Sequence, residues 1–121
     1  MPTSANADSE SGPILVLGDS ISAAYGIPLE QGWVALLEDK LEQHSAPYAV
    51  VNASISGETS AGGLRRLSSL LQRYQPDIVI IELGGNDGLR GYPIGQLRDN
   101  IATMIRKSEA TGAKVLILPM E

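Results

Sequence analysis

The sequence predicts a three-layer α/β fold, in which helices cover both faces of a mostly parallel sheet. Short apolar runs alternate along the chain with longer segments that are apolar on one side only. This alternation is typical of parallel sheets, because each right-handed crossover helix returns the chain to the start of the next strand. In addition, Gly- and Ser-rich segments follow three of the apolar runs, at the strand ends where such folds bind ligands.

Four segments are predicted to be strands because each is a short, nearly continuous apolar run. Strands that helices cover on both faces have no solvent face, so their sequences show little alternation of polar and apolar residues. The first of them, PILVLG, contains no polar side chain. The predicted strands are residues 13–18, 48–53, 77–84 and 114–119.

Three segments between these strands carry apolar side chains at helical spacing. In the first of them, Trp33, Leu37 and Leu41 recur at this spacing, and charged residues occupy the opposite face. The predicted helices are residues 30–44, 61–75 and 95–110. The predicted order of elements is therefore β-α-β-α-β-α-β.

Length and composition indicate one small domain and argue against several classes of function. The 121 residues suffice for a single domain, and no apolar run approaches the roughly 20 residues that cross a bilayer. Fourteen acidic and nine basic side chains give a formal net charge of −5, which argues against nucleic acid as a partner. The absence of cysteine excludes disulfides and thiolate metal sites. Residues 1–12 lack the features of a signal peptide and are expected to form a disordered leader.

Three Gly- and Ser-rich linkers are expected to form one site. GDSIS follows the first predicted strand, NASISGETSAGG the second and ELGGNDGLRGYP the third. Because the carboxyl ends of parallel strands meet at one edge of the sheet, the three linkers should lie together. The linkers expected at the opposite edge, SAPY, YQPD and TGAK, are short and ordinary.

Each linker also has a purely structural interpretation. Residues 18–20 could form a turn with a helix-capping side chain, and Gly57 could be an ordinary turn glycine. Residues 84–87 could form an Asx turn. Together, however, the linkers bring Ser20, a backbone N–H at Gly57 and the side-chain amide of Asn86 to one edge. A serine nucleophile and two kinds of hydrogen-bond donor are what acyl transfer requires.

The segments GDSIS, SISGETSAGG and GGND resemble blocks I, II and III of the GDSL, or SGNH, esterases and lipases. The segment ISAAYGIPLEQGW is similar to the branch of this family that contains thioesterase I, arylesterase and lysophospholipase L1. Ile21 stands where the family name has Leu. The resemblance extends over residues 13–120.

The resemblance implies roles for individual residues. Ser20 would be the nucleophile, and the backbone N–H groups of Ser20 and Gly57 would form an oxyanion hole with the Asn86 side chain. Asp19 and Asp87 would support the loops that carry these groups. The resemblance further implies the three-layer, flavodoxin-like SGNH-hydrolase fold with the strand order 2-1-3-4. It also implies a small acyl ester or thioester substrate, no cofactor, no metal, and a periplasmic or secreted location.

One part of the family pattern does not occur in this sequence. In the family, a D-x-x-H motif near the C-terminus supplies the catalytic Asp and His, and no such motif occurs up to Glu121. The single histidine, His44, is expected in solvent at the C-terminal end of the first helix. Residues 13–121 are therefore expected to be the N-terminal portion of one SGNH domain without its fifth strand. A C-terminal segment or a second chain is expected to cover residues 114–119, because an apolar strand edge invites pairing.

Two functions follow from these observations. The first is hydrolysis of carboxylesters, thioesters or lysophospholipids through an acyl-enzyme on Ser20. The alternative is a catalytically incompetent fragment that binds acyl ligands or needs a complementing C-terminal segment. Dinucleotide-binding, P-loop and α/β-hydrolase functions are disfavoured, because G-x-G-x-x-G, G-x-x-x-x-G-K-[ST] and G-x-S-x-G do not occur.

Overall fold

The computed structural model describes residues 12–19, 32–45 and 48–118, so nearly all of the expected leader and the predicted nucleophile Ser20 lie outside the described residues. No helix within these ranges is long and apolar enough to cross a membrane. The elements, in chain order, are β1 (Ile14–Gly18), α2 (Trp33–Gln43), β2 (Val50–Asn52), α3 (Ser60–Tyr74), β3 (Ile78–Glu82), α4 (Gly85–Leu89), α5 (Ile94–Ala110) and β4 (Lys114–Ile117).

The four strands form one parallel sheet in the order β2-β1-β3-β4, which confirms the predicted order. The central strand β1 pairs with β2 on one side and with β3 on the other. Its last residue, Gly18, lies opposite Glu82, the last residue of β3. The linkers that follow β1 and β3 therefore start from neighbouring points on the same edge of the sheet.

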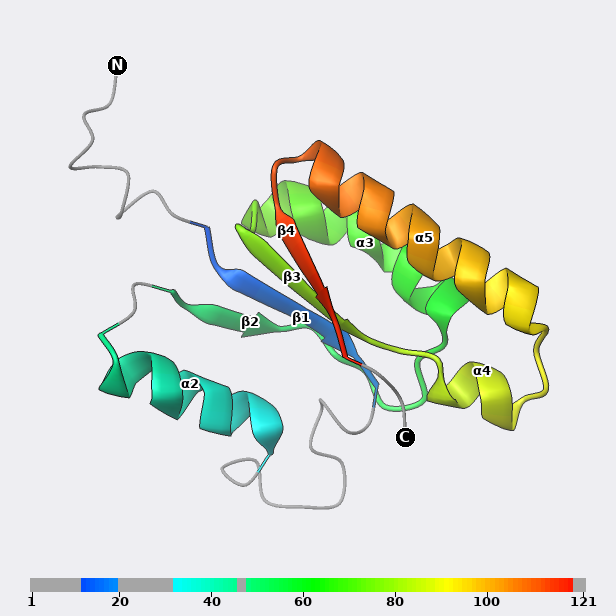
Figure 1. Cartoon of the computed structure of the whole chain (residues 1–121), viewed down its shortest axis with the longest axis horizontal. Coiled ribbons are helices and arrows are strands. Elements are labelled where there is room, and N and C mark those ends of the chain that lie inside the picture. The colour runs from blue at the N-terminus through cyan, green and yellow to red at the C-terminus, as the bar shows by residue number, and fades with distance from the viewer. Residues whose placement is uncertain (1–11, 20–31, 46–47, 119–121) are drawn as a thin grey trace.

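Helix α2 covers one face of this sheet, and α3 and α5 cover the other (Figure 1). Successive side chains of β1 point to opposite faces. Leu17 accordingly packs in a cluster with Leu67 of α3 and Met104 of α5, whereas Val16 packs with Val34 of α2. Burial of each such side chain contributes about 1.5–3 kcal/mol. The apolar run of β1 thus holds helices on both faces, and the predicted three-layer fold is confirmed.

Helix α3 begins at Ser60, one residue before the predicted start, and approaches the sheet closely. Thr59 caps the helix, because its Oγ1 accepts a hydrogen bond of 3.2 Å from the N–H of Gly62. A Cβ at Gly63 would lie only 2.6 Å from Cδ1 of Leu83, so the contact leaves no room for a side chain at that position. The close contact brings the N-terminus of α3 to the edge at which the linkers were expected to meet.

A short helix, α4, occupies the segment that the sequence predicted to be a linker. Gly84 leaves β3 with a φ of 129°, a backbone conformation that residues with side chains rarely adopt. The following turn closes through a hydrogen bond of 3.1 Å from the N–H of Gly88 to the carbonyl of Gly84. Gly, Asn and Asp are typical of turns, which is why the sequence pattern did not distinguish this single helical turn from a loop.

Strand β4 lies at one edge of the described sheet, where it pairs with β3. Its side chains Leu116 and Ile117 are 52% and 40% exposed. Exposed apolar side chains on an edge strand favour pairing with another chain segment. The expectation that a C-terminal segment or a second chain covers residues 114–119 stays a prediction.

Candidate active site

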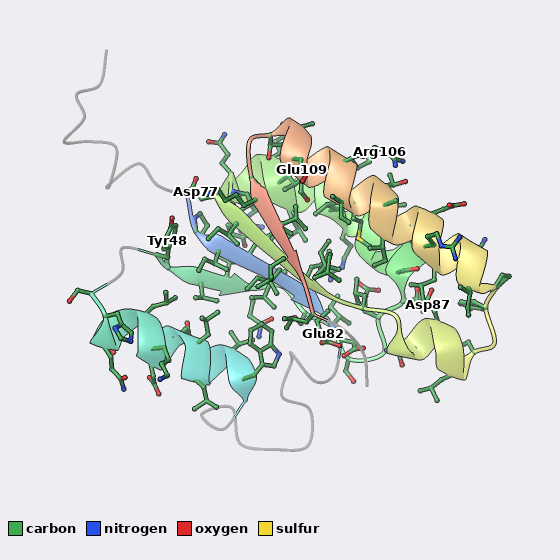
Figure 2. All side chains as sticks on the ribbon, viewed as in Figure 1. Tyr48, Asp77, Glu82, Asp87, Arg106 and Glu109 are labelled. Atoms are coloured by element: carbon green, nitrogen blue, oxygen red, sulfur yellow. The ribbon has the colours of Figure 1, made fainter. Side chains whose placement is uncertain are left out.

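The start of the linker after β1 and the linkers after β2 and β3 meet at the carboxyl edge of the sheet, as the sequence predicted. The N–H of Ile55 donates a hydrogen bond of 3.0 Å to the carbonyl of Gly18, which ties the second linker to the first. The N–H of Asp19 donates to Oε1 of Glu82 at 3.4 Å, which ties the first linker to the end of β3. Figure 2 labels Glu82 and Asp87 at this end of the sheet, whereas Tyr48 and Asp77 lie at the opposite end.

Gly57 lies in a turn of the second linker with a φ of 85°, the left-handed region that favours glycine. The turn is closed by a hydrogen bond of 3.1 Å from the N–H of Glu58 to the carbonyl of Ile55. The N–H of Gly57 donates to no acceptor among the residues that the structure describes. The turn therefore leaves a backbone donor without an acceptor at the carboxyl edge, and the role of Gly57 in an oxyanion hole stays a prediction.

Asn86 in α4 reaches the same turn with its side chain. Its Nδ2 donates a hydrogen bond of 2.9 Å to the carbonyl of Glu58, the residue after Gly57. A carboxamide nitrogen carries two hydrogens, so this bond leaves one N–H of Asn86 for another acceptor. The structure thus brings together Gly57 and Asn86, two of the three predicted oxyanion-hole residues.

Asp87 holds the start of α3 with both of its carboxylate oxygens. Oδ1 accepts from the backbone N–H of Ser60 at 2.8 Å, and Oδ2 accepts from the Ser60 hydroxyl at 2.7 Å. The first N–H groups of a helix have no partner within the helix, and they favour a negative charge beside them. Nδ2 of Asn100, in α5, donates to the Ser60 hydroxyl at 2.9 Å. We call these three residues, Ser60, Asp87 and Asn100, the latch.

The turn that contains Gly57 is held from its other side by Arg66 of α3. Its Nε forms an ion pair of 2.7 Å with Oε2 of Glu58, and its Nη2 donates to the carbonyl of Ala53 at 2.8 Å. One guanidinium therefore binds both ends of the loop in which Gly57 lies. The planar group of arginine suits such paired contacts, because its N–H donors have fixed directions.

Several of these residues were not identified from the sequence. Glu82, buried at the end of β3, was predicted only as part of a strand, and Ser60, buried at the start of α3, only as part of the second linker. The acidic side chain in an otherwise apolar strand was a signal for Glu82 that sequence reasoning did not use. Asn100 and Arg66 gave no such signal. Asn100 contacts Ser60 across 40 residues, and Arg66 contacts Glu58 and Ala53 across 8 and 13 residues.

The predicted nucleophile and the single histidine do not join the cluster that the structure describes at the carboxyl edge. Ser20 lies outside the described residues, and Asp19 immediately before it is buried beside Glu82. His44 caps the C-terminus of α2 and is exposed, as expected. Because α2 runs from the carboxyl edge back to the start of β2, His44 lies at the opposite edge. No group of three or more metal-ligating side chains occurs in the described ranges.

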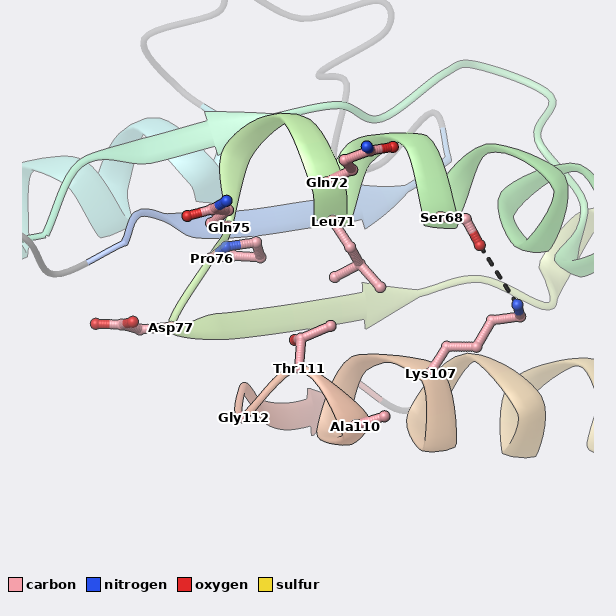
Figure 3. A pocket seen from close by; sticks show the side chains of 10 residues that line it. All are labelled: Ser68, Leu71, Gln72, Gln75, Pro76, Asp77, Lys107, Ala110, Thr111 and Gly112. Carbon is pink, nitrogen blue, oxygen red and sulfur yellow. Dashed lines mark hydrogen bonds between the residues drawn. The ribbon is translucent and has the colours of Figure 1, made fainter.

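A cavity of about 700 Å³ lies at the amino edge of the sheet, away from these residues. Figure 3 shows it between the C-terminal ends of α3 and α5, with Asp77 at the entrance to β3 and a contact of 3.4 Å between Nζ of Lys107 and Oγ of Ser68. The size of this cavity would suit a ligand. Its lining, however, includes none of the residues that the three linkers bring together.

Comparison with known proteins identifies related sequences along most of the chain. Residues 16–121 match the GDSL-like lipase/acylhydrolase family. Esterase TesA of Pseudomonas aeruginosa is 58% identical over 108 residues, which are 89% of this chain and 54% of that protein. The arylesterase of Vibrio mimicus is 48% identical over 105 residues, 87% of this chain and 52% of that protein. The chain therefore spans about half the length of the curated relatives that it matches.

Solved structures share the fold. The crystal structure of TesA, 58% identical, superposes with a TM-score of 0.88 over 90% of this chain and 61% of that chain. The psychrotrophic esterase EstA from Pseudoalteromonas sp., 48% identical, superposes with a TM-score of 0.84 over 91% of this chain and 60% of that chain. The sheet and helices of this chain are those of esterases in this group.

Proposed function

The chain belongs to the GDSL-like lipase/acylhydrolase family, and we propose that it hydrolyses esters through an acyl-enzyme on Ser20. The observation that supports this proposal most is the hydrogen bond of 2.9 Å from Nδ2 of Asn86 to the carbonyl of Glu58. This bond holds a side-chain amide next to Gly57, whose N–H has no acceptor among the described residues. Two donors at the same carboxyl edge can stabilise a developing oxyanion.

In the proposed reaction, the Ser20 hydroxyl oxygen attacks the carbonyl carbon of the ester. The carbonyl oxygen becomes an oxyanion, which accepts hydrogen bonds from the N–H groups of Ser20 and Gly57 and from the free N–H of Asn86. When the carbon–oxygen or carbon–sulfur bond breaks, the alcohol or thiol leaves with a proton and the acyl group stays on Ser20. Water then attacks the acyl carbon, the bond to the Ser20 oxygen breaks, the carboxylic acid is released and the Ser20 hydroxyl is restored.

A general base is needed to remove the proton from Ser20. The single histidine, His44, is exposed at the opposite edge of the sheet. The resemblance implies that the base and its Asp partner come from a D-x-x-H motif, which would lie in the half of the relatives that this chain does not match. The proposed base is therefore a histidine outside residues 1–121.

The substrate class is proposed from the relatives. Their names include esterase, arylesterase and thioesterase 1/protease 1/lysophospholipase L1. We propose carboxylesters, thioesters and lysophospholipids as candidate substrates. The second candidate function is acyl-ligand binding without turnover, and the position of His44, far from the carboxyl edge, favours it for residues 1–121 by themselves.

The experiment compares residues 1–121 with a hybrid protein, in which the C-terminal part of the P. aeruginosa esterase follows residue 118. Both are assayed with p-nitrophenyl butyrate. We expect the hybrid to hydrolyse the ester, and Ser20→Ala in the hybrid to lower kcat by about 10⁶, as removal of a serine nucleophile does. We expect residues 1–121 to bind butyrate with almost no turnover. Equal rates for the two proteins would show that no external base is needed, and an active Ser20→Ala hybrid would exclude Ser20.

A further inference from the structure

The latch joins three helices at one buried point of the carboxyl edge. Ser60 begins α3 and is fully buried, and Asp87 in α4 is 3% exposed. Asn100 belongs to α5 and is partly buried. The three hydrogen bonds among them measure 2.7, 2.8 and 2.9 Å. Short bonds to a buried carboxylate are stronger than those between neutral groups, so the latch fixes the three helices firmly.

The latch has a fixed order of donors and acceptors. A hydroxyl has one hydrogen, and Ser60 donates it to Oδ2 of Asp87. The hydroxyl oxygen can then only accept from Asn100, whose Nδ2 is a donor. Asn100 therefore orients the hydroxyl of Ser60, and Ser60 binds both oxygens of Asp87 through its hydroxyl and its backbone N–H. A carboxylate held at both oxygens cannot rotate without breaking a bond.

The latch lies next to both proposed oxyanion-hole donors. Ser60 is three residues after Gly57, and Asp87 directly follows Asn86. A change in the distance between Ser60 and Asp87 would therefore change the distance between the two donors. An oxyanion donor must lie about 2.7–3.1 Å from the oxyanion, and a displacement of about 1 Å can lower a rate by about 10²-fold.

We infer that Ser60 and Asn100 are positioning residues, which set the spacing of the Gly57 N–H and the Asn86 amide through Asp87. The effect on catalysis rests on the proposed function. The coupling between the latch and the two donors can be measured without any turnover. The chain also offers a matched control. Ser108, in α5, is as fully buried as Ser60, and its hydroxyl has no hydrogen-bond partner among the described residues.

The experiment records the ¹H–¹⁵N spectrum of the full chain and follows two signals, the backbone amide of Gly57 and the side-chain amide of Asn86. We compare Ser60→Ala, Asn100→Ala, the double variant and the control Ser108→Ala. Ser60→Ala should displace or broaden both signals, and Asn100→Ala should displace them less, because it leaves both bonds to Asp87 in place. Because Asn100 acts through Ser60, the double variant should match Ser60→Ala. Ser108→Ala should leave both signals unchanged.

Unchanged signals in a folded Ser60→Ala chain would overturn the inference, as would an equal displacement in Ser108→Ala. If Ser60→Ala does not fold, Asn100→Ala decides, because unchanged signals in that variant exclude the proposed chain of contacts. The proposed function is judged separately by the hydrolysis of p-nitrophenyl butyrate. If the wild-type hybrid is inactive, the latch has no role in catalysis. Displaced signals in the variants would still establish that the latch positions the Gly57 N–H and the Asn86 amide.

Discussion

The two edges of the sheet differ in how their polar groups are used. At the carboxyl edge, Asn86, Asp87 and Arg66 each bind another linker or helix through hydrogen bonds of 2.7–2.9 Å. At the amino edge there is a cavity of about 700 Å³, and the contact between Lys107 and Ser68 there is long, at 3.4 Å, and exposed. The candidate site therefore lies where the hydrogen bonds converge and not at the cavity of the amino edge.

The largest expected difference between the edges is in catalysis. Asn86→Ala in the hybrid protein should lower kcat by about 10²- to 10³-fold with little change in KM, because it removes one proposed donor to the oxyanion. The matched variant is Gln72→Ala, an exposed side chain that lines the amino-edge cavity. The kcat of both variants is measured by hydrolysis of p-nitrophenyl butyrate. An equal fall in kcat for Gln72→Ala and Asn86→Ala would show that the two edges do not differ in their contribution to catalysis.

The next effect is on the stability of the carboxyl edge. Asp87→Ala leaves the N–H and hydroxyl of Ser60 buried without their acceptor. The free energy of unfolding should fall by about 3 kcal/mol, measured by urea unfolding of the full chain. Asp99→Ala, an exposed carboxylate on α5, should change it by less than about 0.5 kcal/mol. Equal losses in the two variants would show that the latch adds nothing to stability.

A smaller effect is expected where Arg66 holds the loop around Gly57. Arg66→Ala removes the ion pair with Glu58 and the bond to the carbonyl of Ala53, and its side chain is 30% exposed. Solvent weakens such contacts, so we expect a loss of about 1 kcal/mol, or about 4 °C in Tm. Arg66→Lys should recover part of it, because lysine keeps the charge without the paired N–H groups. The adjacent exposed Arg65→Ala serves as the control, and a similar loss there would contradict the assignment.

The smallest effect should come from the amino edge. Lys107→Ala and Ser68→Ala break an exposed contact of 3.4 Å, so each should change the free energy of unfolding by less than about 0.5 kcal/mol. Neither should alter hydrolysis by the hybrid protein. A tenfold fall in kcat in either variant would mean that the cavity at this edge contributes to the reaction, and the comparison of the two edges would have to be revised.

The sequence was sufficient to predict the layers and the edge at which the linkers meet. These features depend on local patterns, such as the apolar run of β1 and the linker after each strand, because the carboxyl ends of parallel strands lie at one edge of the sheet. The strand order was predicted from the family resemblance. Gly57 and Asn86 were identified because they lie in short motifs. Their proximity at the carboxyl edge then followed from the parallel sheet, in which the linkers after neighbouring strands meet at one edge.

The contacts that hold these residues could not be predicted in the same way. Asn100 contacts Ser60 across 40 residues, and Asp87 contacts it across 27. Such pairs depend on how closely α3 and α5 pack on the sheet, which the absence of a side chain at Gly63 helps to determine. Helix α4 was missed for a local reason, because Gly84–Asp87 has the composition of a turn as well as that of a short helix.

The start of α5 has a consequence for motion. The residue before it, Pro93, provides no capping side chain, and Ile94 is 73% exposed. Few buried contacts hold this first turn, so it is expected to open by local unfolding at a lower free energy than the rest of the helix. Asn100 lies only six residues further along, and each opening that reaches it releases the hydroxyl of Ser60. On warming, the alignment of the two proposed oxyanion donors should therefore loosen intermittently before the sheet itself melts.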